Sequence, residues 1–113
     1  MPHCIIEYSA GIEKQVAPEN LLNAVNNGAI QSGLFERDDI KTRAIEFTSF
    51  QTGSEKKAFI HVTARILSGR TMEQKKELSY LILEQLKQLE IPSISLTVEV
   101  VEIEKSSYSK IVI

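Results

Sequence analysis

The sequence is poor in cysteine, tryptophan and net charge. Its 113 residues contain one cysteine, Cys4, and no tryptophan, and 15 acidic against 13 basic residues leave a formal charge of −2 at pH 7. A lone cysteine excludes an intrachain disulfide and fits a reducing cytoplasm. The near balance of charge excludes a strongly basic nucleic-acid binder, so we expect no nucleic-acid partner.

Long hydrophobic runs are absent as well. No apolar stretch approaches the roughly 20 residues of a membrane-spanning helix. The amino-terminal segment lacks the basic region that precedes the apolar run of a signal peptide. We therefore expect a cytoplasmic protein with no membrane partner. At this length a single domain, residues 1–113, is expected.

The apolar pattern that is present predicts two β-α-β units in succession. Short apolar or alternating segments indicate strands, and apolar residues at helical spacing between them indicate helices. The second helix follows a capping box, with Thr71 at the cap and Gln74 three residues later. The expected strands are 3–8, 39–50, 57–67 and 94–103, and the expected helices run from Pro18 to Gly33 and from Thr71 towards Pro92.

The two units resemble each other. A shift of 58 residues places His3 on His61 and Gly11 on Gly69, and strand, turn and helix then coincide in order. We therefore predict an α+β fold, an α/β two-layer sandwich built from a duplicated β-α-β unit, with a four-stranded mixed sheet and two helices on one face. The pseudo-repeats are residues 2–53 and 57–104, followed by a C-terminal tail at 105–113.

Helices on one face leave the other face of the sheet without cover. The apolar residues expected there or in the tail are Ile5, Ile45, Phe47, Phe59 and residues 111–113. An exposed apolar surface of this size is more often an association surface than a solvated one. We therefore expect an oligomer, in which the apolar tail adds a strand to a neighbour's sheet.

Pro2 is the residue with the clearest chemistry. A small second residue favours removal of the initiator Met1, which leaves a secondary amine at the end of a strand. Apolar surroundings and nearby cations lower the pKa of an amine towards working pH, where a general base is most effective. The alternative is that Met-Pro is an accident of the chain start. If Met1 is retained, the Pro2 nitrogen is an amide and cannot act as a base.

Arg70 is the second candidate. It lies between Gly69 and the cap of the second helix, where a guanidinium and the helix amides together suit a carboxylate. The alternative is a solvated arginine in a turn. The internal overlay places Ile12 at the position of Arg70 and Ile60 at that of Pro2, so it predicts one site per chain.

Lys41 and Arg43 are two residues apart on one strand face, so both can point at one place. A solvated basic stripe is the alternative. In the overlay they correspond to Glu99 and Val101, so the second half does not repeat the basic pair.

His3, His61 and Cys4 carry weaker signals. The histidines have no carboxylate or thiol at metal-ligand spacing, so we interpret them as strand residues and predict no metal site. Cys4 is interpreted as a small buried hydrophobe rather than a nucleophile.

Several motifs resemble the tautomerase superfamily. Pro2-His3 begins a buried strand, and Ser68-Gly69-Arg70-Thr71-Met72-Glu73-Gln74-Lys75 follows another, which is similar to the 4-oxalocrotonate tautomerase type. The double-length chain, Ser32-Gly33-Leu34-Phe35 and Phe59-Ile60-His61-Val62-Thr63 resemble the 5-carboxymethyl-2-hydroxymuconate isomerase family of aromatic catabolism. The sequence lacks the Cys-x-x-Cys motif of the same-sized macrophage migration inhibitory factor (MIF).

This resemblance implies a MIF-like fold, a homotrimer and no metal or organic cofactor. It implies that Pro2 is the catalytic base and that a small-molecule dicarboxylate, an unsaturated 2-hydroxy (enol) diacid, is the substrate. Arg70 corresponds to the family arginine that binds a carboxylate or polarises a carbonyl. A second family arginine falls on Arg43 in one alignment register and on Lys41 in the other, and lysine gives a single-point donor in place of a bidentate fork.

Two other functions stay open. One is a non-catalytic trimeric binding module that kept the fold and lost the chemistry. The other is a dehalogenase or decarboxylase of the same superfamily, which uses the same proline on a different substrate.

Overall fold

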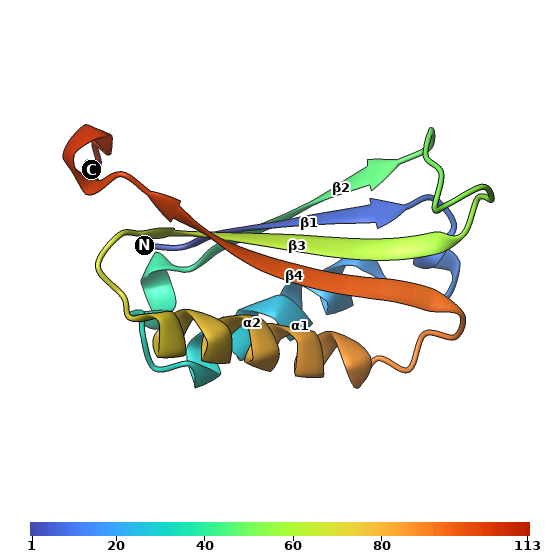
Figure 1. Cartoon of the computed structure of the whole chain (residues 1–113), viewed down its shortest axis with the longest axis horizontal. Helices are drawn as coiled ribbons and strands as arrows, with labels where there is room; N and C mark the ends of the chain where they lie inside the picture. The colour runs from blue at the N-terminus through green and yellow to red at the C-terminus, as the bar shows by residue number, and fades with distance from the viewer.

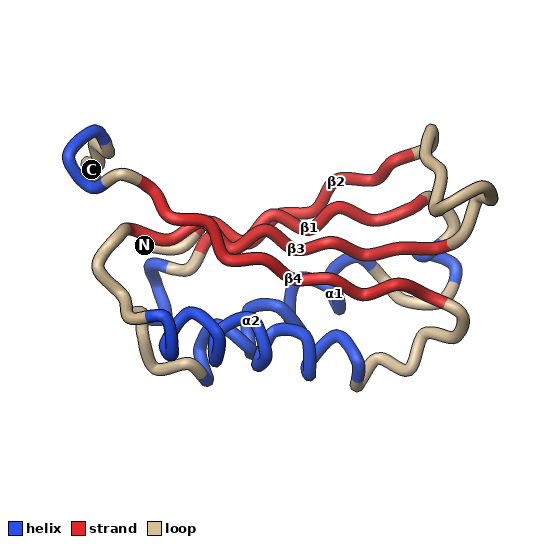
Figure 2. The backbone as a smooth tube through the Cα atoms, in the orientation of Figure 1, coloured by secondary structure: helices blue, strands red, loops and turns tan.

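The computed structural model describes residues 1–113 as a four-stranded sheet with two α-helices (Figure 1). The elements are β1 (His3–Ser9), α1 (Pro18–Gln31), β2 (Lys41–Phe47), β3 (Ala58–Leu67), α2 (Met72–Lys87) and β4 (Ile94–Ile103), with short 3-10 turns at Ile12–Lys14, Arg37–Asp39 and Lys105–Ser107. Both helices lie on the same side of the sheet (Figure 2), as predicted. Neither combines the length and hydropathy needed to cross a bilayer.

The strand order β2-β1-β3-β4 confirms the duplicated β-α-β unit. Each unit forms a parallel pair, β1 with β2 and β3 with β4, and the two units join through the antiparallel β1–β3 pair. In that pair His3 lies opposite Arg65, and Glu7 lies opposite His61. The 58-residue shift exchanges these two pairs, so a pseudo-two-fold axis passes between the central strands.

The outer strands correct the internal overlay by two residues. Lys41 lies beside His3, whereas Thr97 lies beside His61. Thr97 is therefore the structural counterpart of Lys41, and Glu99 is that of Arg43. The reason is that 38 positions separate His3 from Lys41, but only 36 separate His61 from Thr97. The expectation that the second half lacks the basic pair is confirmed.

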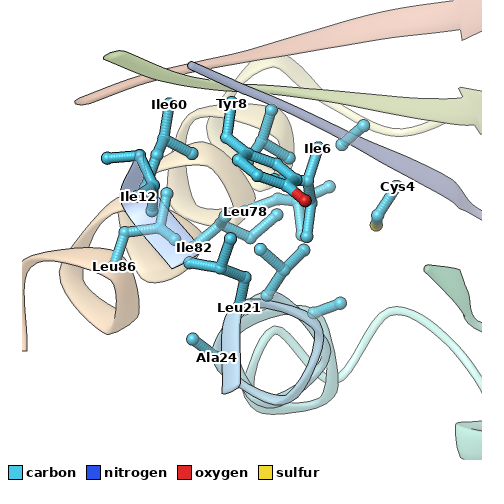
Figure 3. Close-up of a cluster of buried hydrophobic side chains, with 14 of the residues drawn as sticks. Cys4, Ile6, Tyr8, Ile12, Leu21, Ala24, Ile60, Leu78, Ile82 and Leu86 are labelled. Carbon is cyan, nitrogen blue, oxygen red and sulfur yellow. The ribbon is translucent and has the colours of Figure 1, made fainter. Parts of the chain in front are cut away.

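The core lies between the sheet and the helices (Figure 3). Alternate residues of β1 and β3 point into it because side chains along a strand alternate between faces. Its largest members each gain about 1.5–3 kcal/mol from burial. The fully buried large side chains of the core include Ile6, Ile60, Ile66, Leu21, Leu78, Ile82 and Leu86.

The two helices touch most closely at Gly28 of α1. A Cβ atom built on Gly28 would lie 2.7 Å from the Ile82 Cα and 3.0 Å from the Leu81 carbonyl oxygen of α2. Ordinary contacts of a Cβ atom are 3.4–4 Å. Because the obstructing atoms belong to the backbone, only glycine allows this helix spacing.

The start of α2 has the capping box that the sequence predicts. The Thr71 hydroxyl accepts the Gln74 backbone N–H at 3.1 Å, and the Gln74 side-chain oxygen accepts the Thr71 N–H at 2.9 Å. This confirms the capping box, which ties the turn carrying Arg70 to the first turn of the helix.

Two predicted boundaries were wrong. The strand expected over 39–50 is confined to Lys41–Phe47, because β1 offers only His3–Ser9 for pairing. The second helix ends at Lys87 rather than just before Pro92. Glu90 and Ser93 then take left-handed backbone angles (φ 54° and 53°) that lead the chain into β4.

The face of the sheet opposite the helices, here called the open face, carries apolar side chains without cover. Ile45 is 49% exposed and Phe47 is 36% exposed. The tail residues Ile111, Val112 and Ile113 are almost fully exposed. The open face therefore has the character of an association surface.

Candidate active site

One end of the sheet gathers the predicted site residues. Strands β1 and β2 both begin at this end because they are parallel, and β3 finishes there because it is antiparallel to β1. Pro2 precedes β1, Lys41 begins β2, and Arg70 lies in the turn after β3. The Lys41 backbone N–H donates to the Pro2 carbonyl oxygen at 3.1 Å.

Pro2 is buried at this end of the sheet. Its ring lies on the same side as Cys4, which faces the helices, while His3 between them faces the opposite side. The ring is thus buried on the helix side of the sheet.

Burial and nearby charged groups at this end of the sheet change the pKa of the Met1 amine. Partial burial lowers the pKa of the Met1 amine below its ordinary value of 8.0. Asp39 opposes that shift, whereas Arg70, Lys110 and Lys41 add to it because cations disfavour a further positive charge. Asp39 is itself paired with Lys110 at 3.3 Å.

Arg70 is held in place by the segment after α1. One guanidinium nitrogen donates to the Leu34 carbonyl oxygen at 2.7 Å, and the guanidinium carbon lies 5.2 Å from the centre of the Phe35 ring. Gly69 before it has a φ of 124°, an angle that residues with a side chain rarely adopt. The turn therefore aims Arg70 across the end of α1 while leaving other guanidinium donors free.

Lys41 and Arg43 share the open face but reach different groups. The Lys41 ammonium lies 3.2 Å from the Met1 sulfur, beside the chain start. Arg43 is adjacent to Ile5 in β1, and its Nη1 donates to His3 Nδ1 at 3.2 Å. Within one chain, the structure therefore places Lys41 and Arg70 near the chain start that precedes Pro2, and it places Arg43 one step further along the open face.

The other residues with potential chemistry behave differently. Burial raises the pKa of the Cys4 thiol to about 11, which fits the interpretation of Cys4 as a buried hydrophobe. His61 hydrogen-bonds Thr97 and Glu99, both at 2.7 Å, on the open face. No cluster of three or more histidine, cysteine or acidic side chains is arranged to hold a metal ion.

Sequence reasoning missed several groups near the site. Asp39 and Lys110 flank the chain start, and Arg65 and Tyr108 lie close to His3. Arg65 lies opposite His3 through the β1–β3 register, which the 58-residue repeat does not fix because the repeat is compatible with any antiparallel register. Tyr108 and Lys110 follow β4 in an irregular segment, and no local pattern marks where that segment lies.

Comparisons with known proteins identify the family of the chain. The sequence profile of the family described as 5-carboxymethyl-2-hydroxymuconate isomerase matches residues 2–111. The 5-carboxymethyl-2-hydroxymuconate Delta-isomerase of Escherichia coli is 27% identical over 89 residues, which are 77% of this chain and 71% of that protein.

Solved structures share the fold. A 5-carboxymethyl-2-hydroxymuconate isomerase from Deinococcus radiodurans R1 has a TM-score of 0.81 at 24% identity, covering 96% of this chain and 87% of its own. A fused 4-OT symmetric trimer has a TM-score of 0.77 at 18% identity, covering 96% and 90%. The sandwich is thus the tautomerase fold, and the chain, an isomerase, belongs to the 5-carboxymethyl-2-hydroxymuconate isomerase family.

Proposed function

We propose that the protein moves a proton within an unsaturated 2-hydroxy diacid, with the Pro2 nitrogen as general base once Met1 is removed. One observation carries the proposal: the sheet end where Pro2 is buried is also where Lys41 and Arg70 converge. Removal of Met1 places the amine on Pro2, whose ring is buried on the helix side of the sheet. Burial and the two cations then favour an uncharged amine.

The reaction follows from this arrangement. Neutral Pro2 takes the proton from the 2-hydroxyl group, or from the carbon next to a carbonyl. Electrons shift along the conjugated chain, and negative charge spreads onto oxygen as a dienolate. Protonated Pro2 then returns the proton to a distal carbon, which completes the isomerisation without loss of any atom.

Cations stabilise the dienolate and hold the acid groups. Arg70 retains guanidinium donors beyond the one given to Leu34 and serves as the main carboxylate or oxyanion ligand. Lys41 is the strand cation nearer the chain start, whereas Arg43 lies on the same open face at a greater distance from it. Positioned donors of this kind typically contribute about 10²–10³ in rate.

We further propose a homotrimer in a reducing cytoplasm. The exposed Ile45, Phe47 and tail at 111–113 need cover, and a relative of the same fold is a symmetric trimer. Light scattering should give three times the chain mass at micromolar concentration. A stable monomer would contradict this assembly.

The test begins with an intact-mass measurement that verifies the absence of Met1. Trimmed protein is then given 2-hydroxymuconate-type diacids, and ketonisation is followed by ultraviolet absorbance. Arg70→Ala should lower kcat/KM by about 10²–10³, whereas Lys14→Ala, a cation at the other end of the sheet, should leave it unchanged.

Three outcomes would redirect the assignment. Absence of turnover on every such diacid, with Met1 absent, would refute the isomerase. Met1 retained in the native host would favour a non-catalytic binding module. Halide or carbon dioxide release from related acids, with no isomerisation, would identify a dehalogenase or decarboxylase.

A further inference from the structure

A small cavity opens on the open face beside His3. It has a volume of about 240 Å³ and is lined by His3, Ile5, Arg43, Arg65, Ile103 and Tyr108; we call it the His3 cavity. Ligand pockets for whole drug-sized molecules are typically about 300–1,000 Å³. The His3 cavity therefore suits one end of a small molecule better than a large ligand.

The hydrogen bonds of His3 fix its protonation state. An arginine can only donate, so the 3.2 Å contact makes His3 Nδ1 an acceptor from Arg43. Neutral imidazole then carries its proton on Nε2, which donates to the Tyr108 hydroxyl oxygen at 2.8 Å. The Tyr108 O–H is therefore free to donate to something else in the cavity.

The two arginines of the cavity have no acidic partner. The ion pairs of the chain involve Lys57, Lys75, Lys87, Lys110 and His61, and none involves Arg43 or Arg65. The charges that act on His3 are all positive: Arg43, Lys41, Arg65 and the chain amine. Together with burial, which is the largest cause, they lower the pKa of His3 and keep its ring neutral.

Two acids of β4 are engaged elsewhere. Glu102, which follows Val101 on β4, pairs with Lys75 of α2 at 3.4 Å. Glu99 hydrogen-bonds His61 at 2.7 Å. An anion from outside the chain would thus meet guanidinium groups that no carboxylate of this chain neutralises.

We propose that the His3 cavity binds one carboxylate group of an organic acid. Arg65 and Arg43 both line the cavity, and a guanidinium binds a carboxylate through two parallel hydrogen bonds. The free Tyr108 O–H supplies a further donor. Ile5 and Ile103 give the cavity an apolar lining that can contact the carbon chain of the acid, which favours organic acids over inorganic anions.

Binding is tested with adipate, a diacid that has no double bond to isomerise. Imidazole and tyrosine-ring NMR signals of His3 and Tyr108 should shift saturably as adipate is added at constant ionic strength. Arg65→Gln should weaken adipate at least about tenfold, and Tyr108→Phe about two- to tenfold. Lys14→Gln removes the same charge far from the cavity and should leave the affinity unchanged.

Some results would overturn the assignment. Equal shifts with inorganic phosphate or chloride at the same ionic strength would mean general screening. Unchanged adipate affinity in Arg65→Gln would exclude Arg65. Dissociation of the oligomer by Arg65→Gln, seen by light scattering, together with absence of an adipate shift would show that a second copy's carboxylate occupies the cavity.

The binding test and the isomerase test fail separately. Adipate binding that depends on Arg65 in a protein with no turnover keeps the carboxylate site and removes the proposed reaction. Turnover of a diacid by a protein whose His3 cavity binds no adipate keeps the reaction and removes the carboxylate site.

Discussion

Gly28→Ala should destabilise the protein although alanine is the better helix former. The added Cβ meets the Ile82 Cα at 2.7 Å, so α1 and α2 must separate by about 1 Å to reach an ordinary contact of 3.4–4 Å. Overpacking of this kind costs about 1–3 kcal/mol. We expect the upper part of that range, because a gap of 0.5–1 Å also forfeits about a quarter to a half of each dispersion contact nearby.

The helix propensity of alanine offsets about 1 kcal/mol of that cost. The net loss in the free energy of unfolding is therefore about 1–2 kcal/mol, or about 4–8 °C in Tm for a chain of this size. Thermal unfolding followed by circular dichroism measures it, at one fixed chain concentration because assembly shifts Tm. The same variant should raise KM for a diacid, since the helix spacing sets the contact between Arg70 and Leu34.

Asn27→Ala is the matched control. Asn27 is exposed on the same turn of α1, so its replacement by alanine gains helix propensity with no clash and should raise stability by about half a kcal/mol. If Gly28→Ala stabilises the protein as Asn27→Ala does, the close approach of the two helices is not present in solution and the reasoning is refuted.

Three further predictions concern single side chains. Cys4, with a pKa of about 11, should react with a thiol reagent only as fast as the protein opens, and rapid labelling of native protein would contradict its burial. Folding lowers the pKa of His3, so its contribution to the free energy of unfolding is complete above the unfolded pKa of about 6.5 and is lost as the pH falls below that value. Urea titrations from pH 7 to 5 should therefore show a steeper loss of stability in the native protein than in His3→Gln. Thr71→Ala should cost about 1 kcal/mol by removing the helix cap, and Thr71→Ser should restore most of it, as measured by urea denaturation.

Much of the fold was predictable because it depends on local patterns. Apolar alternation located β4, the capping box located the start of α2, and the match of His3 with His61 revealed the repeat. The end of α2 was not predictable, because the chain leaves the helix through left-handed backbone angles at Glu90 and Ser93. Glutamate and serine are not residue types from which such angles are predicted.

The site was predictable only in part, for a geometric reason. Arg70 stands next to recognisable turn and cap residues, so sequence alone marked it. Whether Lys41 or Arg43 lies nearer the base depends on the register between two strands, which the length of the intervening crossover sets. An overlay of the halves does not reveal this register, because the first crossover is two residues longer than the second.

The nearness of the two chain ends governs how the protein can be labelled. The Met1 amine senses Lys110, and the two ends lie at the same end of the sheet (Figure 1). An affinity tag at either end would crowd Pro2, and one fused ahead of Met1 would keep its nitrogen acylated. The turn bridged by Thr52 and Glu55 lies at the opposite end. A cysteine replacing the exposed Ser54 in that turn would give a single fluorophore attachment point, because the native thiol is sealed in the core.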